Sequence, residues 1–320
     1  MQDASMRWPA FAYDEWREAA STLHLWLQVV GKIQLRHTPW INHSWHVALR
    51  TSANGLRTGL MWHERNAFEI EFDFIEHRLL IRLDDGRVST LQLGPQSTAS
   101  FYRTLMRTLA DMGVPVTINT IPSELPDPIP FELDEVHRTY DPEYVHRYWR
   151  VLVQATRVFE QFRAKFIGKC SPVHFFWGSA DLAVTRFSAH EAPPHPGGVP
   201  NLPDWVAREA YSHEVSSAGF WAGDDTSPHP IFYSYAYPEP TGFSDAAVAP
   251  DAAVYDARLR EFVLPYDEVR TAKSPDAALL EFLQSTYEAA ANLAAWDQRA
   301  LERQQALPVG RNSFRPFRPS

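Results

Sequence analysis

Cysteine is almost missing from the sequence, which has only Cys170 among 320 residues. The chain therefore cannot form an internal disulfide or build a metal site from several thiolates. It also lacks a phosphate-binding loop, a dinucleotide fingerprint, a zinc motif and a Gly-x-Ser-x-Gly nucleophile elbow. We accordingly predict no bound cofactor, and serine hydrolase chemistry is disfavoured.

Positive charge and long apolar runs are scarce as well. The 30 Lys and Arg residues face 39 Asp and Glu residues, and the net charge of -9 opposes attraction to nucleic acid and to anionic lipid. No uncharged apolar run approaches the ~20 residues that cross a bilayer. The first residues lack the basic start and apolar run of a signal peptide. We expect a cytoplasmic protein with neither nucleic acid nor membrane as a partner, and the sequence does not predict its oligomeric state.

Aromatic residues, in contrast, are abundant. They make up 13% of a chain that is 45% hydrophobic, so a large core can form and enough rings remain to line a concave site. Such sites bind small molecules. A small-molecule ligand is therefore the expected partner.

Two stretches of the chain follow one order of elements. Helical spacing predicts helices over residues 14–33 and 141–168, and each ends in Gly-Lys. Alternating segments, FEIEFDF at 68–74 and IFYSYAY at 231–237, predict half-buried strands. Further helices are predicted over 100–113 and 277–296. The expected fold class is α+β, with an antiparallel sheet packed by helices in each half.

Short matches between the halves suggest an internal duplication. Thr38-Pro39 and Ser171-Pro172 follow the two Gly-Lys pairs, and RTSA at residue 50 matches RFSA at residue 186. The offsets are nearly constant, so two similar halves at 1–120 and 132–300 are predicted, with chance similarity as the alternative.

Proline marks the remaining segments. IPSELPDPIPF at 121–131 predicts a stiff linker between the halves. The segment 190–203, rich in proline and glycine, predicts a loop inserted in the second half, either a lid over a site or a disordered segment. Residues 301–320 are expected to form a disordered basic tail.

Six motifs, listed here, resemble an uncharacterised bacterial family known only as a domain of unknown function: LHLWLQVVGK, NHSWHV, FDFIEH, GKCSPVHFFWGS, YSHEVSSAGFW and YSYAYPEP. The resemblance covers nearly the whole chain, from Trp8 to about Trp296. It implies no activity, cofactor or site residue, so the chemistry has to follow from the residues themselves.

The densest polar cluster, YSHEVSSAGFW, supplies the first catalytic candidates. His213 and Glu214 are predicted to exchange protons with a ligand, and Ser217 shares the strand face of His213. Asp181 is predicted as a buried acid of the same pocket. The expected ligand-binding walls are Trp177, Ser179, Ser217, Trp221, Tyr233, Tyr235 and Tyr237, in which the three tyrosines share one strand face.

Other residues carry alternatives. His43 and His46 could bind a metal only if a turn broke the strand between them, because a spacing of three puts them on opposite faces. Cys170 follows a helix end, where the dipole opposes a thiolate, so an inert thiol is expected. Lys32 and Lys169 could bind a substrate anion or cap helix carbonyl groups.

The leading hypothesis is an enzyme that acts on a small molecule in an aromatic-lined pocket of the second half. A noncatalytic ligand-binding or sensor protein could use the same pocket. A metalloenzyme with histidine and carboxylate ligands is the third hypothesis.

Overall fold

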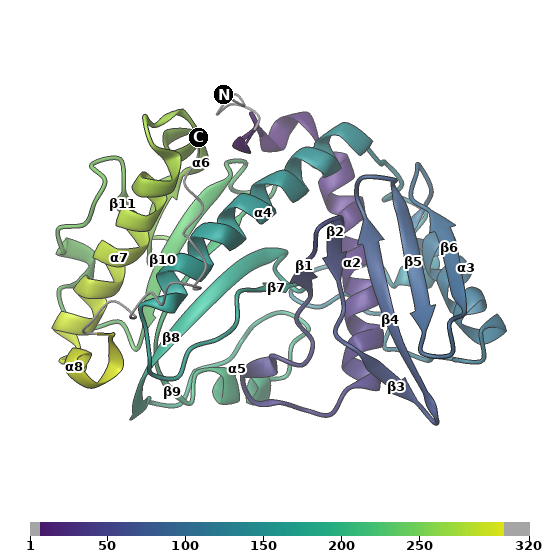
Figure 1. The fold of residues 1–320 in the computed structure, drawn as a ribbon, viewed down its shortest axis with the longest axis horizontal. Coiled ribbons are helices and arrows are strands. Elements are labelled where there is room, and N and C mark those ends of the chain that lie inside the picture. Colours follow the sequence, from purple (N-terminus) through teal and green to yellow (C-terminus); the bar gives the residue numbers. More distant parts are fainter. Residues whose placement is uncertain (1–6, 304–320) are drawn as a thin grey trace, which may run out of the picture.

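The computed structural model describes residues 7–303, and these form two antiparallel sheets packed by helices (Figure 1). The α+β class is confirmed. The predicted tail lies mostly outside the described residues, but Arg303 still donates its backbone N–H to the Lys165 carbonyl. Among residues 7–303 no helix has the length and apolar character needed to cross a membrane.

The first sheet contains β1 (Arg50–Thr51), β2 (Gly55–Arg57), β3 (Met61–His63), β4 (Asn66–Asp73), β5 (Arg78–Leu83) and β6 (Val88–Gln92). Its strands follow the order β1-β2-β4-β5-β6, and β3 pairs with β4. Alternation along β4 buries Phe68, Ile70 and Phe72 completely. On the opposite face Arg82 pairs with Glu71 at 2.8 Å, so arginine from the next strand neutralises the acidic face.

Two helices cover the apolar face of the first sheet, α2 (Arg17–His37) and α3 (Thr98–Asp111). Trp26 of α2 stacks on Phe101 of α3 at 4.7 Å between ring centroids, and Phe101 in turn stacks on Phe72 of β4. These rings join the helices to the sheet, because each is fully buried.

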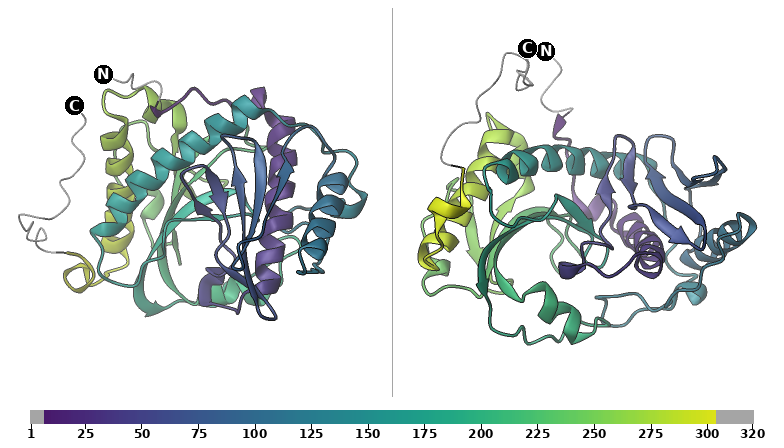
Figure 2. Two further views of the ribbon diagram at one scale, coloured as in Figure 1. Left: turned by 45° about the vertical axis from the view of Figure 1, so that its right-hand side comes forward. Right: turned by 60° about the horizontal axis from the view of Figure 1, so that its bottom comes forward.

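The second sheet follows the order β11-β12-β10-β9-β8-β7. Its strands are β7 (His174–Phe176), β8 (Asp181–Glu191), β9 (His213–Trp221), β10 (Ile231–Tyr237), β11 (Val254–Asp256) and β12 (Glu261–Pro265). One face packs against α4 (Pro142–Ala164), α6 (Tyr266–Thr271) and α7 (Pro275–Leu293). Phe232 and Tyr266 are buried there with their rings 6.2 Å apart. The other face is left for α2 and α5 (Asp204–Ala210) to approach (Figure 2).

The two sheets meet at their first strands. Leu49, next to β1, and Phe175 of β7 exchange two backbone hydrogen bonds of 2.9 Å. The α4 helix crosses this junction, where Trp149 donates to the Ser52 carbonyl at 3.2 Å. Each half therefore contributes to the packing of the other.

The two long helices do not end where the sequence predicts. Asp141 caps α4 by accepting a hydrogen bond from the Tyr144 N–H, as its position before Pro142 predicts. However, α4 ends at Ala164, four residues before Gly168. The α2 helix continues past Gly31 to His37, because this glycine is a packing position and not a stop.

The internal duplication is not confirmed. In the first half β4, β5 and β6 lie side by side in chain order, whereas in the second half β12 inserts between β10 and β11. The matched motifs also occupy different places, since Arg50 is in an edge strand and Arg186 is in an interior strand. Arg186 is buried, with its guanidinium 3.4 Å from the Phe162 ring centroid.

Gly31 gives a direct test of the packing between the halves. A Cβ atom at this position would lie 2.2 Å from the Trp177 ring. We predict that Gly31→Ala lowers the free energy of unfolding by about 1–3 kcal/mol, although alanine favours helix. Chemical denaturation of wild type and Gly31→Ala measures the difference in the free energy of unfolding. Gly94→Ala, where no atom lies within 4 Å of the added Cβ, is the control, and equal stability of the two variants would contradict the prediction.

Candidate functional site

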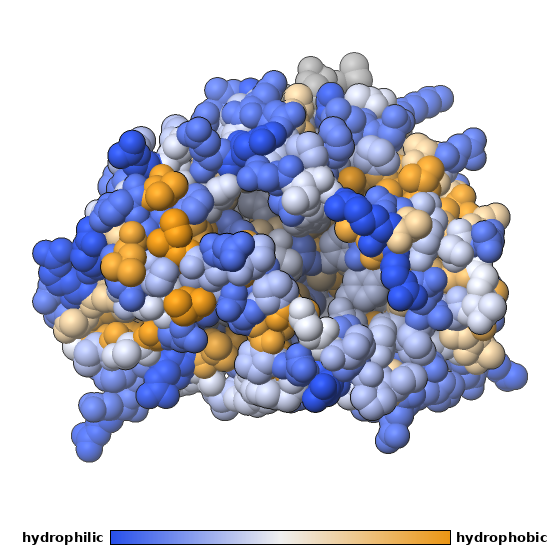
Figure 3. Space-filling model, turned by 180° about the vertical axis from the view of Figure 1, so that it is seen from behind, coloured by the Kyte–Doolittle hydropathy of each residue, from blue (hydrophilic) through white to orange (hydrophobic). Residues whose placement is uncertain are grey.

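A cavity of about 900 Å³ lies on the face of the second sheet that α4 and α7 leave uncovered. The molecule is visibly hollowed on this side, near the centre of the view from behind (Figure 3). The strands β7 to β10 form its floor, and its walls come from α2, α5, η2 (Asn42–Ser44) and residues 117–124. The cavity is thus built by both halves and by the segment predicted as a linker.

The floor of the cavity is polar because alternate residues of neighbouring strands are in register. Tyr235 of β10 pairs with Ser217 of β9, which pairs with Thr185 of β8. The hydroxyl groups of Ser217 and Thr185 are hydrogen bonded at 2.8 Å. Side chains at these positions point to the same face of the sheet, so the strand period of two builds the floor directly.

Asp181 is the buried acid of this floor, at the start of β8. Ser179 donates a hydrogen bond of 2.5 Å to one carboxylate oxygen, and the Tyr233 hydroxyl donates to the other. Tyr233 reaches Asp181 across the intervening strand because Gly219 there has no side chain; a Cβ atom on it would lie 2.3 Å from the phenol. Burial raises the pKa of Asp181, while the two hydrogen bonds lower it in part.

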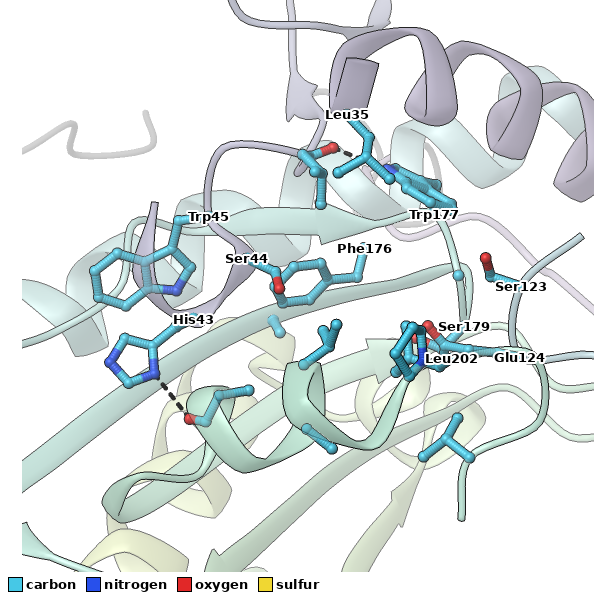
Figure 4. Close-up of a pocket in the computed structure, with 18 of the residues that line it drawn as sticks. Leu35, His43, Ser44, Trp45, Ser123, Glu124, Phe176, Trp177, Ser179 and Leu202 are labelled. Carbon is cyan, nitrogen blue, oxygen red and sulfur yellow. Dashed lines mark hydrogen bonds between the residues drawn. The ribbon is translucent and has the colours of Figure 1, made fainter. Parts of the chain in front are cut away.

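Glu124 lies beside Asp181 and was not predicted from the sequence. Its φ of 64° is in the left-handed region, which costs about 1–3 kcal/mol for a residue other than glycine. Its carboxyl group occupies the space next to Gly178, close to Ser179 (Figure 4). Within residues 7–303 this carboxyl group has no hydrogen bond or ion pair. Burial, followed by the charge of Asp181, raises the pKa of Glu124 to about 7.

A third carboxyl group and a pair of tyrosines extend the cluster. The hydroxyls of Tyr211 and Tyr235 are hydrogen bonded at 2.7 Å. Glu261 starts β12, the strand beside β10, and burial together with the charges of Asp181 and Asp256 raises its pKa to about 8. Like charges near one another resist ionisation, so Asp181, Glu124 and Glu261 form one electrostatic group.

The loop at 190–203, predicted as a lid or a disordered segment, forms one wall of the cavity. Glu124 donates its backbone N–H to the Pro200 carbonyl at 2.8 Å, and Asn201 donates to the Leu125 carbonyl at 2.6 Å. The Tyr237 hydroxyl donates to the Pro193 carbonyl. The loop and the proline-rich segment are therefore hydrogen bonded to each other, and this contact positions Glu124.

The predicted site residues fall into two groups. The structure brings six of the ligand-binding or acidic candidates into the cavity wall; these are Trp177, Ser179, Asp181, Ser217, Tyr233 and Tyr235. His213 and Glu214 are at the outer end of β9 and do not line it. His213 contacts Ser212, and Glu214 lies 3.4 Å from His190. Tyr237 fastens the loop instead of lining the cavity.

Trp221 lines a second cavity, of about 560 Å³. Glu124, Gly178 and Ser179 line both cavities, so Glu124 stands in the partition between them.

His43 and His46 are used in local hydrogen bonds. His43 accepts from Lys169 at 2.6 Å through one ring nitrogen and donates to the Ala210 carbonyl through the other. The His46 ring accepts from the Ile41 N–H. In the part of the chain that the structure describes, no three His, Cys, Asp or Glu side chains are grouped to hold a metal ion.

The remaining candidates have clear environments. Burial raises the pKa of the Cys170 thiol to about 11, which disfavours the thiolate at neutral pH, in line with the inert thiol expected. Lys32 cannot cap the end of its helix, because α2 continues for another turn; its side chain lines the cavity instead.

Sequence reasoning missed Glu124, Tyr211 and Glu261. Glu124 is the one acidic residue of the segment 121–126, which lies in the stretch that the proline content predicts to be a linker. A carboxyl group within a stiff, otherwise apolar stretch was the available signal. Tyr211 and Glu261 carried none, since Tyr211 reaches Tyr235 from the end of α5 by a side-chain hydrogen bond and Glu261 does so through the pairing of β12 with β10.

Together the fold and the cavity define an α+β protein with two antiparallel sheets and a cavity on one face of the second sheet, lined by aromatic rings and acidic side chains. The chain belongs to a family of unknown function, DUF5996, which residues 8–303 match. Searches of curated proteins and of solved structures found no match.

The raised pKa of Glu124 makes stability depend on pH. The folded protein keeps the proton up to about pH 7, whereas the unfolded chain releases it near 4.5, so wild-type stability falls as the pH rises between these values. Glu124→Gln removes this loss. We predict that the variant gains up to about 3 kcal/mol relative to wild type between pH 4.5 and 8, measured by urea unfolding.

Glu281→Gln, which removes an exposed carboxyl group on α7, is the matched control. A stability difference between wild type and Glu124→Gln that stays constant over this pH range would contradict the prediction.

Proposed function

We propose that this protein is an enzyme that acts on a small molecule in the main cavity and moves protons with Glu124 and Asp181. The observation that carries the proposal is Glu124, a carboxyl group without a protein partner among the described residues, held in a left-handed backbone conformation beside Asp181. Strained, unsatisfied polar groups in cavities are typical of catalytic sites. A structural role would be served better by a paired side chain.

The acidities of the two carboxyl groups suit general acid–base catalysis. With a pKa of about 7, Glu124 is present in both protonation states near neutral pH and can give or take a proton. Asp181 is held in one orientation by Ser179 and Tyr233. When one of the two groups releases its proton, its charge favours retention of the proton on the other, which supports assigning different roles to them.

The cavity supports a small organic substrate. Its volume of about 900 Å³ is within the range of pockets that enclose drug-sized molecules. Trp177 and Phe176 offer apolar ring surfaces, and Tyr233 and Tyr235 offer hydroxyl groups. The net charge of -9 and the single cysteine support action on a small molecule in the cytoplasm, without nucleic acid or membrane as partner.

Metabolite profiling tests the proposal. Purified wild-type protein is incubated with a small-molecule extract, and consumption of compounds is followed by mass spectrometry. We predict that at least one compound is consumed by wild type, and that Asp181→Asn and Glu124→Gln slow this by at least 100-fold, because removing a general acid or base costs about 10²–10⁴ in rate.

His213→Ala is the matched control, since His213 does not line the cavity. Turnover lost in His213→Ala but kept in both carboxyl variants would restore the sequence-based assignment. A compound that binds wild type but is never consumed would instead identify a noncatalytic binding or sensor protein.

A further inference from the structure

The side chain of Lys32 is a buried cation in the main cavity, and no carboxylate of the described residues balances its charge. The residue is 7% exposed and lies in the C-terminal half of α2. Its ammonium group donates a hydrogen bond of 3.0 Å to the Ser123 hydroxyl and lies 5.8 Å from the Trp177 ring centroid. Across residues 7–303 no carboxylate lies within ion-pair distance of it.

Such an arrangement is unfavourable for the protein alone. A buried charge is costly unless it is paired, and burial already lowers the pKa of Lys32 to about 8. A hydroxyl group provides one hydrogen bond but no charge. The ammonium group therefore has donors left for a ligand that carries the missing negative charge.

Arg36 provides a second cation for the same ligand. It follows Lys32 by one helical turn and lines the same cavity, so both side chains lie on one face of α2. Among the described residues its guanidinium group makes no ion pair. A lysine and an arginine placed at this spacing can hold the oxygens of one carboxylate or phosphate group.

From this geometry we infer that the substrate is a small organic anion, whose carboxylate or phosphate group binds Lys32 and Arg36. The inference rests on the proposed function, which places the reacting end of the substrate at Glu124 and Asp181. Ser123, which contacts Lys32, directly precedes Glu124, so the anion site adjoins the acid pair. The rings of Trp177 and Phe176 then face the apolar body of the same molecule.

Titration with simple anions tests the site. Sodium phosphate, acetate and benzoate are added at constant ionic strength against sodium chloride, and tryptophan fluorescence and the unfolding temperature are recorded. We predict saturable binding of at least one anion, about tenfold weaker in Lys32→Gln and several-fold weaker in Arg36→Gln. Preference for phosphate or for benzoate distinguishes the two anion chemistries.

Three further variants make the outcome decisive. Lys32→Arg keeps the charge and should keep most of the affinity, whereas Lys273→Gln removes an exposed cation before α7 and should have no effect. Asp181→Asn should lose turnover but still bind anions saturably, which separates failure of the proposed catalysis from failure of this site. The inference would be overturned by equal affinity in wild type, Lys32→Gln and Arg36→Gln, or by the absence of saturable binding of any anion. Because Arg36 is exposed, the Arg36→Gln variant is expected to fold.

Discussion

The contact between Trp177 and Gly31 is the constraint on which the geometry of the site depends. The indole ring occupies the space that a side chain at residue 31 would fill, and its N–H donates to the Val47 carbonyl at 2.9 Å. One ring thereby joins the second sheet, the long first helix and the segment before β1. His24 of the same helix bonds the carbonyl groups of residues 177 and 178, so the turn that leads to Asp181 is fixed on both sides.

Two other glycines in the cavity wall also make room for a side chain. The missing side chain of Gly178 leaves room for the Glu124 carboxyl group, and that of Gly219 leaves room for the Tyr233 phenol. Each of these glycines lies where a large or charged side chain from a distant segment enters the wall. A methyl group at residue 178 or 219 would lie within 2.4 Å of that side chain. The acid and the ring can therefore hold these positions only because the backbone that they approach carries no side chain.

Local patterns predicted the main helices and the strands at 68–74 and 231–237, and strand alternation predicted which tyrosines share a face. The strand at 231–237 has the bounds expected from IFYSYAY, and the tyrosines share a face because the side-chain period is two. The end of the first helix was misplaced because glycine signals both a stop and a close contact, and only the tertiary partner Trp177 distinguishes them. Glu124 was missed because its position depends on hydrogen bonds between two proline-rich segments 76 residues apart, such as Asn201 to Leu125.

The electrostatics of the cavity oppose the stability of the fold. The charge of the buried Asp181 raises the pKa of Glu124 and of Glu261, and Lys32, which is hydrogen bonded to Ser123, has no counter-ion among the described residues. Elsewhere the chain pairs such groups, as Arg82 does with Glu71 and Glu69 on the open face of the first sheet. Lys32 donates a hydrogen bond to Ser123, which directly precedes Glu124, yet it forms no ion pair with any carboxyl group of the described residues. Because burial penalises each of these charges separately, the anionic substrate that we propose would supply the charge that Lys32 lacks.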